Sequence, residues 1–304
     1  MSAGPGIRTQ DMSKDHVVLS IIITNWNTRE LLRVLLASIV HHPPVTSFEI
    51  LVVDNGSKDG SAAMVRQEFP DVRLIENSGN RGYAVANNQG YAASQGNLIL
   101  LLGSDTVIID ESLQRMTEYL REHTEAGAVT CRLLNPEGTP QLSCRRFPTL
   151  GDAVLTYLSL HRFARRYTMA GFDSGRTQEV EQPAATCLMV RRDLLDSIGL
   201  FDERFTILYN DVEFCRRIRQ TGRPIIYLGT AEIVHYGSQS TRQASPSLRL
   251  EMYRNILLYY QHTLGWHTRW ILLPILMVRL LAATRSRLAF QLLNPLRHEA
   301  QNDR

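Results

Sequence analysis

Three uninterrupted apolar runs alternate with helical patterns in the first third of the chain, and this order constrains the fold more than any other feature. The runs are Val17 to Thr24, Phe48 to Val53 and Leu98 to Leu102. Runs rich in Val, Ile and Leu, without polar alternation, are typical of parallel strands buried on both faces. Helical patterns occupy residues 29–40 and 83–94. The β-α-β order predicts an α/β fold with a mostly parallel sheet flanked by helices.

Polar residues follow each of the three apolar runs. Asn25-Trp26-Asn27 comes after the first run, Asp54 after the second, and Asp105 shortly after the third. The carboxyl ends of parallel strands meet at one edge of a sheet, and ligands of such sheets bind there. These residues are therefore predicted to form one candidate site.

The remaining secondary structure is predicted from helix starts and shorter patterns. Ser57, Asp110 and Asp193 each precede a helical pattern, where an oxygen-bearing side chain can cap the first turn. Residues 132–182 show only a short helical pattern near 150–163, and an apolar strand follows at 184–192. A helix is expected over 247–264, with an apolar stripe formed by Leu250, Tyr253, Leu257, Tyr260 and Leu264.

Basic charge is concentrated in the C-terminal fifth of the chain. From Arg242 to Arg297 there are eight arginines and one acidic residue, Glu251, a balance of +7 against +3 for the whole chain. The apolar run from Trp270 to Val278 contains Pro274 and is followed by Arg279, so it is shorter than the roughly 20 residues of a membrane-spanning helix. One interpretation is a basic amphipathic helix on a membrane surface. The other is a helix packed on the core.

Several classes of protein are disfavoured by composition. The four cysteines form no CxxC pair, which argues against a zinc site or a disulfide scaffold and suits the cytosol. Residues 1–16 are polar and lack an apolar core, so we expect a flexible tail and no signal peptide. The basic segment lacks the aromatic residues of a recognisable nucleic-acid-binding module, so no nucleic-acid partner is expected.

Seven motifs occur in order along residues 17–240. They are Thr24-Asn25-Trp26-Asn27, Asp54-Asn55-Gly56-Ser57, the loop Asn77 to Asn88, Gly103-Ser104-Asp105, the segment Gly199 to Phe205, Asn210-Asp211-Val212-Glu213, and His235-Tyr236-Gly237-Ser238. The series resembles the inverting family-two glycosyltransferases of the GT-A fold, in particular their rhamnosyltransferase-like branch. It covers about three quarters of the chain.

The resemblance implies an enzyme that transfers a sugar from a nucleotide donor with inversion at the anomeric carbon. Residues 17–106 would form the nucleotide-binding half, 107–240 the acceptor-side half, and 241–304 a basic amphipathic helical extension. The residues expected to bind the sugar nucleotide are Thr24, Asn25, Trp26, Asn27, Asp54, Asn55, Asn80, Arg81, Gly82, Ser104 and Asp105.

A divalent metal, Mn²⁺ or Mg²⁺, is also implied, because the leaving diphosphate carries charge that a hard cation stabilises. Asp105 stands where the family has the last carboxylate of its metal-binding motif, and His235 resembles the family's late histidine ligand. A histidine ligand would favour Mn²⁺. The chain departs from the family at Gly103, where the first carboxylate is missing.

Asp211 matches the general base of the family, the aspartate of a Glu-Asp pair at the start of a helix. The first member of that pair is Asn210 here, a second departure. From the residues alone, Asp211 could instead only cap the helix, whose N-terminus favours anions. The resemblance places Glu213 and Arg217 on the acceptor side.

Within this branch, the expected reaction is transfer of L-rhamnose from dTDP-rhamnose to a glycan or polyprenyl-linked acceptor in cell-surface polysaccharide synthesis. It would take place at the cytoplasmic face of the membrane. UDP-galactofuranose, UDP-hexose and GDP-mannose are alternative donors. A non-catalytic GT-A binding protein is another alternative, because of Gly103 and Asn210. A nucleotidyltransferase is disfavoured, because residues 25–28 do not resemble the Gly-rich basic loop of that class.

Overall fold

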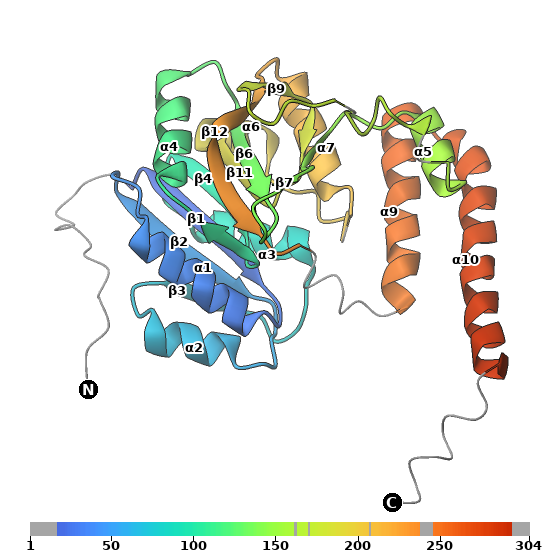
Figure 1. Cartoon of the computed structure of the whole chain (residues 1–304), viewed down its shortest axis with the longest axis horizontal. Coiled ribbons are helices and arrows are strands. Elements are labelled where there is room, and N and C mark those ends of the chain that lie inside the picture. The colour runs from blue at the N-terminus through green and yellow to red at the C-terminus, as the bar shows by residue number, and fades with distance from the viewer. Residues whose placement is uncertain (1–16, 161–162, 170, 207, 238–245, 294–304) are drawn as a thin grey trace, which may run out of the picture.

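The computed structural model describes residues 17–160, 163–169, 171–206, 208–237 and 246–293, and has an α/β architecture around one large sheet (Figure 1). Four neighbouring strands are parallel, which confirms the prediction for residues 17–106. In spatial order they are β3 (Arg73–Glu76), β2 (Phe48–Asp54), β1 (Leu19–Asn25) and β4 (Leu98–Gly103). The register sets Asn25 opposite Asp54 and Thr24 opposite Gly103. The predicted polar residues therefore lie along one edge.

The other half of the sheet mixes strand directions. β11 (Cys187–Arg191) lies antiparallel between β4 and β6 (Ala128–Leu134). β12 (Ile225–His235) is parallel to β6 and antiparallel to β5 (Thr106–Ile108). The α/β class is confirmed, whereas parallel pairing is confined to the first four strands and the β6–β12 pair. The antiparallel β5–β12 pair is important for the site, because it sets His235 opposite Thr106.

Four short strands complete this half. β7 (Pro140–Gln141) pairs with β6, and β9 (Gln178–Val180) pairs with β12. β8 (Cys144–Arg145) and β10 (Gln182–Pro183) form a separate two-stranded sheet. They all lie within the segment that showed no periodic pattern or directly at its end, because strands this short carry no hydrophobic period.

Helices cover both faces of the large sheet because alternate strand residues point to opposite sides. Ile21 and Ile23 of β1 belong to an apolar cluster with three helices, whereas Ile22 belongs to a cluster on the other face with three different helices. The first set is α1 (Arg29–His41), α2 (Ser61–Glu68) and α4 (Ser112–Glu122), and the second is α3 (Tyr83–Ala93), α6 (Arg192–Ile198) and α7 (Asn210–Gln220).

The three predicted helix caps are wrong. Ser57 lies four residues before α2, where its hydroxyl accepts hydrogen bonds from the ends of β1, and Gly60 precedes the helix instead. Asp110 has a φ of +49°, and Glu111 occupies the cap position of α4. Strand β11 runs directly into α6, so Asp193 lies inside the first turn and pairs with Arg223.

The C-terminal segment forms two helices, α9 (Pro246–Leu264) and α10 (Thr268–Leu293), joined at Gly265. They pack beside α5 (Leu150–Tyr157) to one side of the sheet (Figure 1). Leu272 and Leu276 of α10 are buried in a third apolar cluster that also contains Phe205 and Val212. One face of α10 therefore packs on the core, as the second interpretation of this segment predicted. No helix in the described part of the chain combines the length and apolar content that crossing a bilayer requires.

Candidate active site

The polar residues that follow β1 and β2 form one hydrogen-bonded cluster. The buried amide of Asn25 donates to Asp54 Oδ2 at 2.9 Å and to Ser57 Oγ at 3.2 Å. Thr28 Oγ1 donates to Asn25 Oδ1 at 2.7 Å and lies 2.8 Å from Ser104 Oγ. Buried polar groups are costly unless they are paired, so this network fixes the ends of β1, β2 and β4 against one another. Asn25, Asp54 and Ser104 lie together as predicted.

The loop between β3 and α3 is held beside this edge by Asn55. The Asn55 amide donates to Asn80 Oδ1 and to the Gly82 carbonyl, both at 3.1 Å, and its oxygen accepts the Arg81 backbone N–H at 3.0 Å. Gly82 has a φ of +87°, and a Cβ at this position would lie 3.1 Å from the carbonyl oxygen of Thr206. Glycine is therefore required for both backbone shape and space. The side chain of Arg81 is left exposed.

Three more predicted residues lie at the end of β1 with different surroundings. Thr24 Oγ1 is buried, and no residue in the described part of the chain bonds it, so it can bond a ligand. Trp26 is half-buried. Asn27 adopts a φ of +52°, which asparagine tolerates better than most residues, and its Oδ1 accepts the Lys58 backbone N–H at 2.8 Å.

Asp105 and His235 are brought together by the β5–β12 pair. Asp105 Oδ1 lies 3.4 Å from His235 Nε2, and both side chains are mostly buried, at 13% and 14% exposure. The Tyr236 backbone N–H donates to the Asp105 carbonyl at 2.9 Å. On the other side of the imidazole, His235 Nδ1 lies 2.5 Å from Gln141 Oε1, and Gln141 Nε2 donates to Asn135 Oδ1 at 3.0 Å.

These contacts fix how the two side chains face each other, and their role as metal ligands stays a prediction. With Gln141 oriented by Asn135, His235 Nδ1 carries the proton, and the lone pair of Nε2 faces the Asp105 carboxylate. His235 Nε2 and Asp105 Oδ1, which lie 3.4 Å apart, would both be stabilised by a cation bound between or beside them, because both can donate a lone pair. The described residues contain no group of three or more His, Cys, Asp or Glu side chains arranged for a metal. Further ligands would have to come from water and a diphosphate, as is common for Mg²⁺.

Asp211 lies in the first turn of α7, and its backbone N–H is held by Asn210 Oδ1 at 2.8 Å. Tyr209 occupies the cap position of α7, and Asp211 Oδ1 accepts the Val212 N–H at 2.8 Å, so the carboxylate also satisfies one of the free N–H groups in the first turn. Burial raises the pKa of the Asp211 carboxyl, while the Val212 hydrogen bond and the charge of Arg145 lower it. A raised pKa suits a group that must accept a proton.

Tyr83 is a partly buried residue at the start of α3 that sequence analysis did not single out as a site residue. Its hydroxyl donates to the Ala185 carbonyl at 2.9 Å. Burial raises the pKa of the Tyr83 phenol, and the charges of Asp211 and, more weakly, Asp105 raise it further. Asp211 is also hydrogen-bonded by the backbone of Ala185, so Tyr83 and Asp211 contact the same residue. The only sequence signal was its position in the Gly82-Tyr83 pair.

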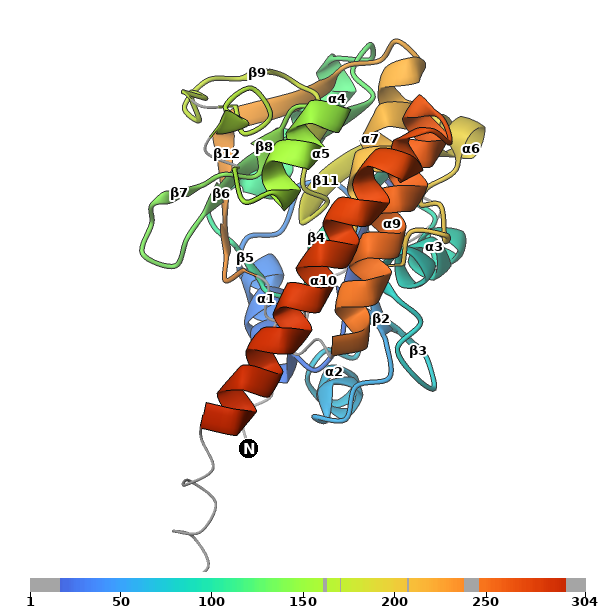
Figure 2. The same cartoon turned by 90° about the vertical axis from the view of Figure 1, so that its right-hand side faces the viewer.

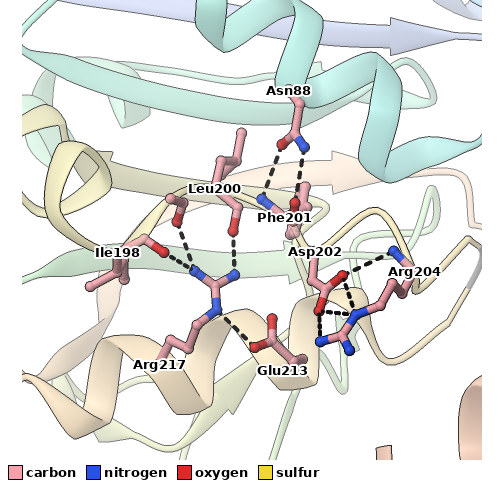
Figure 3. Close-up of polar contacts among 9 residues, drawn as sticks. Asn88, Ile198, Leu200, Phe201, Asp202, Arg204, Glu213 and Arg217 are labelled. Atoms are coloured by element: carbon pink, nitrogen blue, oxygen red, sulfur yellow. Dashed lines mark hydrogen bonds and ion pairs between the residues drawn. The ribbon is translucent and has the colours of Figure 1, made fainter. Parts of the chain in front are cut away.

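The structure gives Glu213 and Arg217 partners inside the protein (Figure 3). Arg217 Nε donates to Glu213 Oε1 at 2.8 Å, and its two terminal nitrogens bond the carbonyls of residues 198–200. Nearby, Asn88 pairs with both the N–H and the carbonyl of Phe201 at 3.0 and 2.9 Å. These contacts tie α7 and α3 to the loop that precedes α7. Placement of Glu213 and Arg217 on the acceptor side stays a prediction.

Two hollows lie outside this cluster. The larger, of about 540 Å³, is lined by residues of α1 and α4 such as His42, Glu111 and Arg115, and contains none of the predicted site residues. The smaller, of about 30 Å³, lies beside Tyr209 and is also lined by Tyr157, Tyr167 and Asp152. A space of that size holds a water molecule and excludes a sugar ring.

Residues 20–199 match the model of the family described as glycosyl transferase family 2. The chain belongs to this family. It is 26% identical over 259 residues to the N-acetylglucosaminyl-diphospho-decaprenol L-rhamnosyltransferase of Mycobacterium tuberculosis, covering 79% of this chain and 84% of that protein. It is 29% identical over 232 residues to the O-antigen biosynthesis protein RfbC of Myxococcus xanthus, covering 74% of this chain but 18% of RfbC.

Solved structures agree with the predicted GT-A fold of this family-two glycosyltransferase. A mannosyltransferase from Pyrobaculum calidifontis in complex with GDP-Man and Mn²⁺ is similar with a TM-score of 0.55 and 17% identity, over 93% of this chain and 85% of that one. Staphylococcus aureus TarS (residues 1–349) is similar with a TM-score of 0.54 and 18% identity, over 94% and 77% of the two chains. The predicted family, its rhamnosyltransferase-like type and the enzyme class are confirmed.

Proposed function

We propose that this glycosyltransferase moves L-rhamnose from dTDP-rhamnose to a sugar carried by a lipid diphosphate. The observations that carry the proposal are the Asp105–His235 pair at 3.4 Å and the shared contact of Tyr83 and Asp211 with the backbone of Ala185, near the edge where β1, β2 and β4 end. The choice of donor and acceptor is supported by the similarity to the M. tuberculosis enzyme, which extends over most of both chains.

In this reaction Asp211 takes the proton of the acceptor hydroxyl while that oxygen attacks the anomeric carbon. The bond to the nucleoside diphosphate breaks, and its electron pair leaves with the diphosphate oxygen. Asp105 and His235 would hold the divalent cation, which supplies positive charge to the leaving diphosphate. Asn25, Asp54 and the loop at residues 80–82 would hold the nucleotide. Each Asp54 oxygen keeps a lone pair beyond its internal hydrogen bond.

A transfer assay tests this function. We expect the purified chain with Mn²⁺ to form a rhamnosyl product of inverted configuration from dTDP-rhamnose and synthetic N-acetylglucosaminyl-diphospho-lipid. UDP-galactofuranose, UDP-glucose and GDP-mannose should give little product. Product from one of these donors, with none from dTDP-rhamnose, would correct the donor. Binding of dTDP-rhamnose without transfer or hydrolysis would favour a non-catalytic protein.

The metal assignment is tested in the same preparation. Asp105→Asn and His235→Gln should each remove the gain in dTDP affinity that Mn²⁺ gives the wild type, because each removes one of two ligands that lie 3.4 Å apart. Binding without metal should stay unchanged in calorimetry. Asp202→Asn is the matched control, because Asp202 pairs with Arg204 in a different loop. Equal, metal-independent binding in all four proteins would exclude the assignment.

We also propose that the outer face of α10 rests on an anionic membrane surface. Trp270, Val278 and Leu281 are 71%, 66% and 56% exposed, whereas Leu272 and Leu276 are buried on the opposite face. The exposed residues recur at helical spacing and form an apolar stripe beside Arg269, which is also exposed. Figure 2 shows α10 lying across the front of the molecule, next to α5. Apolar and basic residues together suit the headgroup region of a bilayer.

Substitution of the stripe should separate membrane binding from folding. We expect Trp270→Gln with Val278→Gln to reduce co-sedimentation with phosphatidylglycerol vesicles several-fold, with an unchanged melting temperature, because both side chains are exposed. Removal of residues 266–304 is a poorer test, since it would strip Leu272 and Leu276 from the third apolar cluster. Val34→Gln, at a 45% exposed position on α1, is the control. Undiminished co-sedimentation of the double variant would exclude this surface.

A further inference from the structure

Arg145 stands apart from the other half-buried arginines near the site. It lies on β8, and its guanidinium carbon is 5.9 Å from the ring centre of Tyr167. Arg132 and Arg217 are paired with Glu232 and Glu213. For Arg145, by contrast, the described residues supply neither a hydrogen-bond acceptor nor a carboxylate within ion-pair distance, and the only close partner is the aromatic face of Tyr167.

An arginine in this situation is prepared to bind an anion. Its five N–H donors match the oxygens of a phosphate or carboxylate in a forked geometry. Burial without such a partner costs free energy, and charge-assisted bonds recover it. The ring of Tyr167 restricts the guanidinium plane, so less conformational entropy is lost when an oxyanion binds.

The position of Arg145 relative to the base defines which substrate it meets. Arg145 pairs in register with Gln182 of β10, and α7, the helix that carries Asp211, packs against β10, where Cys215 Sγ lies 3.8 Å from the Pro183 carbonyl oxygen. The charge of Arg145 accordingly opposes the rise that burial causes in the pKa of Asp211. The proposed donor side lies further along the same segment, where the Tyr83 hydroxyl bonds the Ala185 carbonyl and the Gly103 N–H bonds the Thr186 carbonyl. Arg145 therefore lies at the end of residues 182–186 that is away from the proposed donor side.

Two other arginines close to Arg145 in the described part of the chain have carboxylate partners. Arg146 lies 3.6 Å from Glu181, and Arg166 lies 3.4 Å from Asp152. The adjacent hollow of about 30 Å³ is too small for a sugar, so a ligand of Arg145 would lie outside it. The exposed residues Leu158 and Phe163 follow α5, whose Thr156 carbonyl accepts a hydrogen bond from Arg279 of α10.

We propose that Arg145, which lies over the ring of Tyr167, binds the phosphate group of the acceptor. This inference rests on the proposed function and adds the residue that recognises the charged part of the lipid-linked substrate. A phosphate held beside Asp211 keeps the attached sugar at the base, while the apolar tail extends toward α10.

Calorimetry in metal-free buffer with chelator tests the proposal, with geranyl diphosphate and dTDP as probes. Arg145→Gln should raise the Kd of geranyl diphosphate about tenfold or more, because it removes a charge-assisted contact, and should leave dTDP binding unchanged. Arg145→Lys keeps the charge and loses the fork, so an intermediate Kd is expected. Arg146→Gln, next to it in sequence but paired with Glu181, is the control and should behave like the wild type.

The outcomes that overturn the proposal are specific. Geranyl diphosphate that does not bind the wild type, or binds Arg145→Gln equally well, excludes an acceptor-phosphate site at Arg145. A rise confined to the Kd of dTDP would assign the arginine to the leaving nucleotide instead. Arg145-dependent binding in a chain that transfers no sugar from any donor would refute the proposed function and leave this site standing, so the two failures are distinguishable.

Discussion

Asp211→Asn should lower turnover by roughly two to four orders of magnitude, because an amide cannot accept the proton of the acceptor hydroxyl. Donor binding should change little, since the nucleotide contacts lie at Asn25, Asp54 and the loop at residues 80–82. Rates of rhamnosyl transfer at saturating substrate, together with calorimetry of dTDP, measure the two effects. Because burial raises the pKa of Asp211, wild-type turnover should fall on the acid side at a pH above the ordinary aspartate value of 3.8.

The same substitution should not destabilise the protein. A folded-state pKa above the unfolded value means that the fold binds the proton more tightly, so stability falls as the pH rises through the interval between the two values. At neutral pH the ionised Asp211 therefore costs stability, and Asn removes that cost. An unchanged or higher melting temperature with lost turnover is the signature of a catalytic base. Full activity of Asp211→Asn, with inactive but folded Glu213→Gln, would move the base to Glu213.

The edge that holds the site was predictable because two regularities coincide there. Buried parallel strands carry continuous apolar runs. Because parallel strands end at the same edge of the sheet, the polar residues that follow these runs lie along that edge together. This placed Asn25, Asp54 and Asp105 together without knowledge of any contact. His235 is different: its approach to Asp105 depends on the antiparallel β5–β12 pair, which no periodicity indicated. Only the resemblance to the family connected the two.

Residues that sequence analysis missed lie where secondary structure is too short to leave a pattern. Gln141, which orients His235, is on the two-residue strand β7, and Arg145 is on the two-residue strand β8. Neither has a neighbour in sequence that indicates its role. Gln141 is placed by a hairpin with β6, and Arg145 by pairing with β10, a strand far along the chain.

Tertiary contacts also changed details that local rules had predicted. Ser57 is a good capping residue, but its hydroxyl accepts hydrogen bonds from Asn25 and Asn27 and is not available to α2. In α9 the middle of the expected apolar stripe is confirmed, because Tyr260 is buried and Tyr253 and Leu257 pack against the third apolar cluster, whereas the two ends, Leu250 and Leu264, are 59% and 41% exposed. Contacts with α10 and Phe205 determine which face of α9 is buried. More than one face of this helix carries apolar residues, so the sequence alone did not define the buried face completely.

Arg217→Met should destabilise the fold by about 3–5 kcal/mol, because it leaves the buried charge of Glu213 without its partner. The Glu213 side chain is only 6% exposed, and Arg217 also satisfies the carbonyls of residues 198–200. Denaturant unfolding measures the change. The replacement retains the apolar stem, so lost packing contributes little.

Two companion variants identify the source of this loss. Arg204→Met removes the neighbouring pair with Asp202 (Figure 3), where the arginine side chain is 59% exposed, and should cost about 0–1 kcal/mol. Glu213→Met combined with Arg217→Met removes both charges and should recover part of the stability that Arg217→Met alone loses. If the double variant is as unstable as the single one, the carbonyl contacts at 198–200 dominate. If Arg217→Met costs no more than Arg204→Met, this ion pair does not fix α7, and the position of Asp211 must depend on Asn210 and the third apolar cluster.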